Sequence, residues 1–152
     1  MTLITRRLTL ALLCFLAGSG CGAEKHKYDA KATFPVKGKV LVDGQPASLV
    51  TVTCVPVKPA DQSIPNATGL TDKDGKFALG TYKAGDGVPE GDYVLTFTWA
   101  ALSTFKHTSA AANEGDKLNG RYTDAKTSET KFTVKKGPPT DLGEIKLTTN
   151  PQ

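Results

Sequence analysis

The chain has 152 residues, of which 39% are hydrophobic and 22% are charged, and its formal net charge at pH 7 is +4. This length is enough for one folded domain and too short for two domains of ordinary size. The lysines are scattered singly and form no basic stripe interleaved with aromatic residues. The sequence therefore predicts no nucleic-acid partner.

The first 20 residues have the three parts of an export signal. Two arginines form a basic start, an apolar run follows over residues 8–17, and three small residues precede Cys21. The apolar run has about ten residues, whereas a helix needs roughly 20 to span a bilayer. We therefore expect a cleaved signal peptide over residues 1–20 and no permanent transmembrane helix.

Residues 17–21, Ala-Gly-Ser-Gly-Cys, resemble the lipobox of bacterial lipoproteins, in which signal peptidase II cuts before a cysteine that carries a diacylglyceryl group. The resemblance implies that Cys21 is lipidated and that residues 21–33 form a lipidated cysteine and a polar tether. Several acyl chains on one residue hold a protein stably at a membrane. Gly18 departs from the leucine that is commonest in the box, and the alternative is an ordinary secretory cleavage that leaves Cys21 as a free thiol.

The expected location is the cell envelope, with the protein exported and held by its lipid. Gly22 follows Cys21, so the acidic residue that retains some Gram-negative lipoproteins at the inner membrane is missing. This favours the outer membrane over a periplasm-facing inner membrane.

After the tether, short runs rich in β-branched and aromatic residues alternate with clusters of Gly, Pro, Asn and Asp. This pattern is typical of an all-β sandwich or barrel, and no run has a helix-length apolar period. Strands are expected at 34–42, 49–57, 76–82, 93–99, 129–135 and 142–148. We predict a single immunoglobulin-like or prealbumin-like sandwich of about seven strands over residues 34–149.

The alternation of side chains predicts which face of each strand is buried. The side chains expected to point inward are Phe34, Val36, Val40, Val42, Tyr93, Leu95, Phe97, Trp99, Phe132, Val134, Ile145 and Leu147. The run from Leu49 to Val57 is apolar on both parities, which predicts a central strand. Asp43-Gly44 is expected to form a turn, and Asp72-Lys73-Asp74-Gly75 a hairpin turn in which Asp accepts backbone hydrogen bonds and Gly takes a positive φ.

The cysteines predict no disulfide. Cys14 is lost with the signal peptide and Cys21 is the lipid site, which leaves Cys54 alone in an apolar run. We interpret Cys54 as a small buried hydrophobe, with a reactive thiol as the weaker alternative.

Short motifs along the chain resemble the carboxypeptidase regulatory-like, or transthyretin-like, β-sandwich domain. They are Val36-x-Gly38-x-Val40, Asp43-Gly44-x-Pro46, Thr71-Asp72-x-Asp74-Gly75-x-Phe77 and Gly87-x-Pro89-x-Gly91-x-Tyr93. The closing Leu118-x-Gly120-Arg121-Tyr122 and Leu142-Gly143-x-Ile145-x-Leu147 are similar to small lipoproteins of planctomycete-like bacteria. The resemblance covers residues 34–147 and implies a structural domain.

No enzyme, cofactor or metal is expected. Transthyretin-like proteins include hydroxyisourate hydrolase, which uses several His and Arg residues, whereas the domain here has one histidine, His107. Asp72 and Asp74 resemble the start of a calcium loop, but the later oxygen ligands are missing, so a plain turn is favoured. An isopeptide bond from Lys37 or Lys39 to Asn150 is a remote alternative, because both lysines lie on the outward parity.

The expected partner surface comprises Trp99, Phe105, His107 and Tyr122, around an Ala/Ser/Thr-rich stretch at residues 100–117. Loops on a rigid β scaffold are where recognition usually occurs, although the interpretation of Trp99 as a core or rim aromatic is favoured over a binding role. The function expected is that of a membrane-anchored, non-enzymatic lipoprotein that contacts an envelope protein or polysaccharide. The alternative is an accessory domain that binds a glycan or a small ligand.

Overall fold

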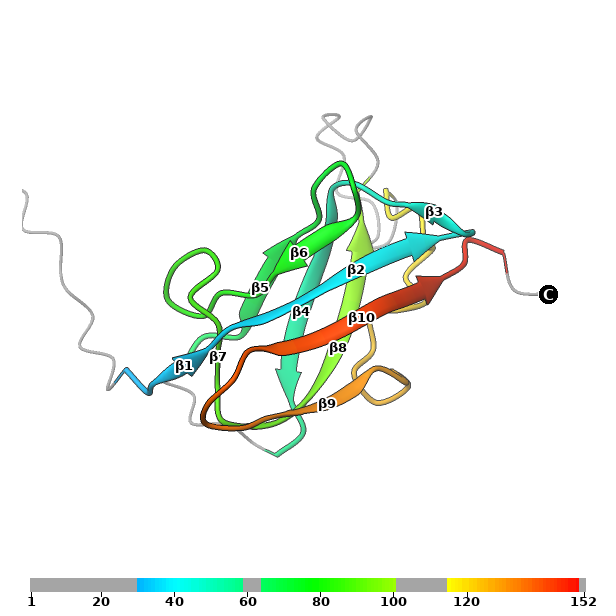
Figure 1. Cartoon of the computed structure of the whole chain (residues 1–152). Coiled ribbons are helices and arrows are strands. Elements are labelled where there is room, and N and C mark those ends of the chain that lie inside the picture. The colour runs from blue at the N-terminus through cyan, green and yellow to red at the C-terminus, as the bar shows by residue number, and fades with distance from the viewer. Residues whose placement is uncertain (1–29, 59–63, 101–114, 151–152) are drawn as a thin grey trace, which may run out of the picture.

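A computed structural model of the chain describes residues 30–58, 64–100 and 115–150 (Figure 1). Within these ranges the chain is all-β and contains ten strands and no helix. The strands are β1 (Thr33–Phe34), β2 (Val36–Val42), β3 (Gln45–Pro46), β4 (Val50–Pro56), β5 (Ala67–Leu70), β6 (Lys76–Ala78), β7 (Val88–Pro89), β8 (Gly91–Trp99), β9 (Lys131–Val134) and β10 (Thr140–Leu147). The described residues therefore contain no helix that could cross a membrane.

The strands form three small sheets. One four-stranded sheet has the order β5-β4-β8-β9, and all of its pairs are antiparallel. In the other, β2 pairs with β10 on one side and with β3 and β6 on the other. The two-residue strands β1 and β7 form a separate antiparallel pair. Ten strands are thus present where about seven were expected, and three of the ten have only two residues each. The strands that lie outside the expected ranges are β3, β5 and β7.

The predicted inward faces are confirmed along the central strands. Val36, Val40 and Val42 of β2 are buried, whereas Lys37 between them is exposed. As the doubly apolar pattern predicted, β4 is a central strand, with β5 on one side and β8 on the other. Phe97 of β8 is buried, and so are the predicted inward residues of β10. The alternation is incomplete: Tyr93, Trp99 and Phe132 are only partly buried, and residues of the opposite parity are also buried, namely Leu41, Val94 and Thr96.

The turn at residues 72–75 forms as expected, with the Asp72 carboxylate accepting the amides of Asp74 and Lys76 at 2.9 Å and Gly75 at a φ of 76°. It does not, however, join two strands of one sheet, which corrects the predicted hairpin. It carries the chain from β5, which pairs with β4, to β6, which pairs with β2. Phe77 of β6 lies opposite Gly38 of β2, and a Cβ atom at Gly38 would come within 2.8 Å of the Phe77 ring, so the glycine leaves room for this ring.

The pair formed by β2 and β10 is parallel, although the two strands lie at opposite ends of the domain's sequence (Figure 1). Ile145 lies opposite Val40, and Leu147 opposite Val42. On the outer face, two ion pairs link the strands: Lys37 Nζ to Asp141 Oδ2 at 3.2 Å and Lys39 Nζ to Glu144 Oε1 at 3.0 Å. Exposed ion pairs of this kind contribute about 0–1 kcal/mol each, so burial of the apolar face holds the pair together.

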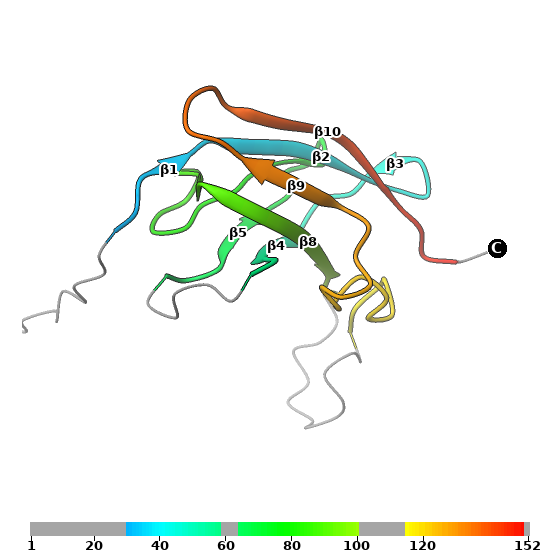
Figure 2. The same cartoon turned by 90° about the horizontal axis from the view of Figure 1, so that it is seen from below.

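Side chains from both four-stranded sheets contribute to one hydrophobic core. The fully buried members with the largest side chains are Phe97, Leu79, Leu95, Leu118, Val36, Val40, Val50, Val52, Val88 and Val134. Figure 2 shows β2 and β10 on one side of this region and β4, β5 and β8 on the other. Both sheets are therefore held by the same buried surface.

Candidate functional site

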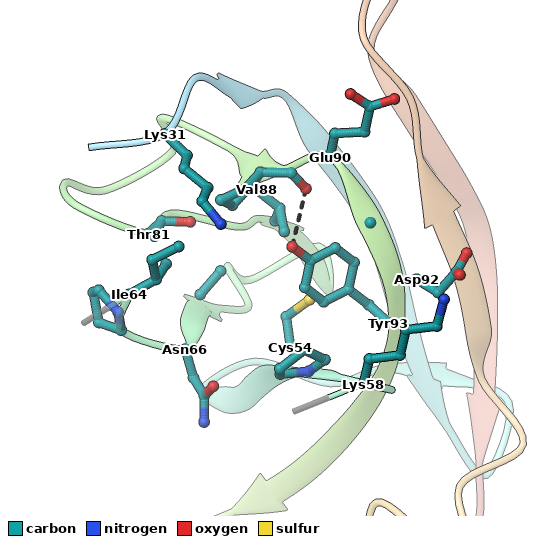
Figure 3. A pocket seen from close by; sticks show the side chains of 15 residues that line it. Lys31, Cys54, Lys58, Ile64, Asn66, Thr81, Val88, Glu90, Asp92 and Tyr93 are labelled. Carbon is teal, nitrogen blue, oxygen red and sulfur yellow. Dashed lines mark hydrogen bonds between the residues drawn. The ribbon is translucent and has the colours of Figure 1, made fainter. Parts of the chain in front are cut away.

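A cavity of about 280 Å³ opens at the end of the molecule where β1 pairs with β7 (Figure 3). Five stretches of chain build it: the residues before β1, the end of β4 with the residues after it, the residues that lead into β5, the loop between β6 and β7, and the segment from β7 into β8. Its lining residues are Lys31, Cys54, Pro56, Lys58, Ile64, Pro65, Asn66, Ala67, Thr81, Val88, Pro89, Glu90, Gly91, Asp92 and Tyr93.

The floor of the cavity is apolar. Cys54 is 1% exposed, Ala67 is 4% exposed and Val88 is fully buried. Burial raises the pKa of the Cys54 thiol to about 12, because the thiolate would lose its hydration there. Cys54 is therefore the buried small hydrophobe that the sequence predicted, and its thiol stays protonated at neutral pH.

Tyr93 forms one wall and is fixed at both ends of its side chain. Its hydroxyl donates to the carbonyl oxygen of Pro89 at 3.0 Å, and its ring stacks on Phe132 with the ring centroids 5.9 Å apart. Burial raises the pKa of Tyr93 to about 12, and the neighbouring Cys54 and Tyr82 add to the shift. The phenol is therefore a neutral, rigid wall.

The opposite wall is held by the carboxylate of Asp86. This group accepts the backbone amides of Thr81, Tyr82 and Lys83 at 2.7, 3.1 and 3.1 Å. The Thr81 hydroxyl in turn donates to the carbonyl oxygen of Gly87 at 2.7 Å. These bonds close the loop between β6 and β7 and hold Thr81 and Val88 at the cavity.

Four charged side chains lie at the rim of the cavity, and Figure 3 labels them: Lys31, Lys58, Glu90 and Asp92. The ammonium group of Lys31 points into the cavity, whereas the carboxylate of Glu90 points away from it (Figure 3). Asp92 is turned toward β9, where its Oδ1 accepts the hydroxyl of Thr133 at 2.7 Å. Lys58 lies on the side of Tyr93 (Figure 3). A solute in the cavity therefore meets a cation and an apolar floor.

Trp99, predicted as part of a partner surface, lies at the far end of β8 as a half-buried rim aromatic. Its indole Nε1 donates to the carbonyl oxygen of Ser48 at 2.9 Å, and the Lys117 ammonium lies 4.3 Å from the ring centroid. The carboxylate of Asp116 accepts the backbone amide of Trp99 at 2.7 Å. Two contacts thus hold the ring, and a third holds the backbone of Trp99.

Tyr122 lies beside the same strand but has a packing role. Its ring meets Phe97 edge to face, with the centroids 6.5 Å apart, and its carbonyl oxygen accepts the Phe97 amide at 2.8 Å. Its hydroxyl accepts the amide of Thr148 at 3.0 Å. The other predicted surface residues, Phe105 and His107, lie outside the described residues, as does Cys21.

The structure gives partners to the residues that the sequence raised as alternative sites. Lys37 and Lys39 form the ion pairs with β10, and the backbone N–H of Asn150 donates to the Thr148 hydroxyl at 3.2 Å. The carboxylate of Asp72 accepts the backbone amides of Asp74 and Lys76 in the turn. In residues 30–58, 64–100 and 115–150, no group of three or more His, Cys, Asp or Glu side chains is arranged to hold a metal ion.

Sequence reasoning missed the cavity. The segment from Gly87 to Tyr93 was interpreted as a fold signature, and nothing in the chain's pattern links Lys31 with Ala67 or Tyr93. A single lysine in a polar segment, such as Lys31, does not by itself indicate a binding site. The cavity arises from tertiary contacts between segments that are far apart in sequence.

No protein-family model matches the chain, and no curated protein matches it. Among solved structures it is similar to a DUF3823 family protein from Parabacteroides merdae, with a TM-score of 0.37 and 13% identity over 78% of this chain and 46% of that one. It is also similar to a 9R-lipoxygenase from Cyanothece, with a TM-score of 0.35 and 11% identity over 76% of this chain and 16% of that one. The chain thus spans less than half the length of either protein. It is an all-β protein with several antiparallel sheets and distant structural matches, and no family is assigned.

Proposed function

We propose that this chain is an exported bacterial lipoprotein, anchored in the cell envelope through Cys21, and that its β domain is a non-enzymatic interaction module. We further propose that the two four-stranded sheets are the layers of one immunoglobulin-like or prealbumin-like sandwich of the carboxypeptidase regulatory-like type. The shared core of both sheets supports the sandwich, and the lipobox-like end at residues 17–21 supports the anchor.

The proposal rests on the position at which the chain enters the domain, which is at the opposite end of β8 from Trp99. Thr33 of β1 pairs with Pro89 of β7, and β8 begins two residues later at Gly91. The nine residues of β8 then extend to Trp99, roughly 27 Å away at about 3.4 Å per residue. A tether attached before β1 would thus hold one end of the domain near the membrane and present the Trp99 end outward.

A non-enzymatic role is supported by the state of the groups in the cavity. The Cys54 thiol and the Tyr93 phenol have raised pKa values of about 12, so neither supplies an anionic nucleophile or a base at neutral pH. The Trp99 end instead offers a partly exposed aromatic ring, and tryptophan is enriched among the residues that contribute most to binding energy at interfaces.

The anchor is tested by intact mass and membrane fractionation of the chain expressed in a bacterial host, with Cys21→Ser as the comparison. We expect the unsubstituted chain to lose residues 1–20, gain acyl mass and sediment with membranes, and the Cys21→Ser chain to gain no acyl mass. An unacylated, freely released unsubstituted chain would contradict the anchor.

The interaction role is tested by co-sedimentation with two purified envelope fractions, polysaccharide and outer-membrane protein. Trp99→Ala should lose most of the binding to one fraction, while Tyr82→Ala at the opposite end of the domain should retain it. Equal binding by both variants would contradict a role for the Trp99 end. Binding to the polysaccharide alone would favour the accessory glycan-binding alternative.

A further inference from the structure

The cavity at the β1–β7 end plays no part in the proposed interaction role, yet it has the features of a small-molecule site. Its floor is buried and apolar, and its walls are fixed by the hydrogen bonds of Tyr93 and Asp86. Binding sites for small molecules are typically concave, mostly apolar and largely preformed, with a few polar groups that set orientation. The cavity therefore requires little rearrangement to accept a solute.

Charge decides which solute fits. Lys31 points its ammonium into the cavity, Glu90 points away, and Asp92 is held by Thr133 (Figure 3). The Cys54 thiol at the floor and the Tyr93 phenol in the wall are neutral at pH 7, so neither repels an anion. A cationic head group at Lys31 would face another cation, and the two rim carboxylates are directed away from that position, whereas an anionic head group would gain a charge-assisted hydrogen bond.

Volume limits the size of the solute. About 280 Å³ corresponds to roughly nine water molecules at about 30 Å³ each. A ligand of about eight or nine non-hydrogen atoms therefore fills the cavity, which is too small to enclose a disaccharide or a phospholipid.

We propose that this cavity binds a small amphipathic monoanion, namely a carboxylate on an apolar body of about five carbons. The carboxylate lies at Lys31 and the apolar body lies against Cys54, Ala67 and Val88. This site is independent of the partner surface at Trp99, so either proposal stands if the other fails.

The test uses three probes of equal length, hexanoate, hexanamide and hexylammonium, titrated into the full chain and followed by ¹H–¹⁵N chemical shifts. We expect the backbone amides of Ala67, Val88 and Tyr93 to shift. Hexanoate should bind about fivefold more tightly than hexanamide, as expected for one exposed charge pair, and hexylammonium most weakly.

Two substitutions locate the site. Lys31→Gln should remove the preference for hexanoate over hexanamide, whereas Lys73→Gln, at an exposed turn lysine, should leave it unchanged. Ala67→Leu fills the cavity floor and should weaken binding of all three probes. Because Ala67→Leu also strains the core, the shift map of the unsubstituted chain is the second, independent readout.

The proposal is overturned by any of three results. The first is no shift at these amides with about 10 mM hexanoate, a concentration at which a Kd of about 1 mM is nearly saturated. The second is equal affinity for hexanoate and hexylammonium. The third is a hexanoate preference that survives Lys31→Gln.

Discussion

The carboxylate of Asp116 binds the backbone amide of Trp99, with Oδ1 2.7 Å from the nitrogen. The same carboxylate accepts the amides of Leu118 and Gly120 at 3.0 and 2.9 Å. One side chain thus fixes the turn over residues 116–120 and ties it to the last residue of β8. Because Asp116 is only 8% exposed, water cannot readily replace it.

Asp116→Ala should therefore lower the free energy of unfolding by about 2–4 kcal/mol, because three amides lose a charged acceptor in a mostly buried setting. Denaturant unfolding of the two chains measures the difference. Asp124→Ala is the matched control, since the exposed Asp124 accepts the amide of Lys126 at 2.8 Å from a similar turn. An equal loss in both variants would show that burial of Asp116 contributes nothing.

Gly75 and Gly44 provide a second matched pair. Both have a positive φ, of 76° and 80°, but a Cβ atom at Gly75 would lie 2.4 Å from the carbonyl oxygen of Val40, whereas nothing lies within 4 Å of one at Gly44. Gly44→Ala should cost about 1 kcal/mol from backbone conformation alone. Gly75→Ala should cost about 2–4 kcal/mol, because overpacking is added. Equal unfolding midpoints would contradict the contact with Val40.

Asp43 joins the turn after β2 to the residues that follow β10. The hydroxyl of Thr149 donates to its Oδ2 at 2.7 Å, and the hydroxyl of Thr148 donates to its Oδ1 at 2.8 Å. These bonds, with the Thr149 side chain contributing most, lower the pKa of Asp43 below its ordinary value.

A carboxyl whose pKa is lowered by folding stabilises the folded state above the unfolded pKa, and this contribution is lost as the pH falls through the folded pKa. Between about pH 5 and pH 2, the melting temperature of Asp43→Asn should therefore fall less steeply than that of the unsubstituted chain. The pKa of Asp141 is also lowered, chiefly by the amide of Gly143, so part of the slope should remain.

Thr149→Val removes the largest cause of the shift and should return the pKa of Asp43 toward its ordinary value. Carboxyl ¹³C chemical shifts followed through an acid titration measure it. An unchanged Asp43 pKa in this variant would contradict the role of the Thr149 hydroxyl.

Cys54 should resist alkylation in the folded protein. Its sulfur is buried and its pKa is about 12, so both access and the thiolate fraction are low. Iodoacetamide at mildly alkaline pH should leave Cys54 unmodified until denaturant is added, as read by peptide mass mapping. Rapid modification of the native chain would contradict the buried floor of the cavity.

Much of the fold was predictable because local sequence encodes local structure. The alternation around Val36 and Val40 assigned the buried face of β2, and the apolar run around Cys54 identified a central strand. Side-chain parity depends only on the pleat of one strand, so it needs no knowledge of the partner. Turn residues act in the same way, and Asp72 and Gly75 formed the expected turn.

The partner of each strand was not predictable, because parity says which face is buried but not which strand lies alongside. The parallel pairing of β10 with β2 depends on contacts between Val40 and Ile145, more than 100 residues apart. The passage of the chain between sheets at residues 72–75 is likewise a matter of strand pairing, because β5 pairs with β4 whereas β6 pairs with β2.

The sequence by itself thus determined the all-β class, the buried faces, the position of the turn residues and the expectation of an anchor at Cys21. Tertiary structure alone decided which strands pair and where the cavity lies. Lys31, Ala67 and Tyr93 come together only after the sheets have formed, because each side chain is placed by backbone that is fixed by remote hydrogen bonds and by the shared core.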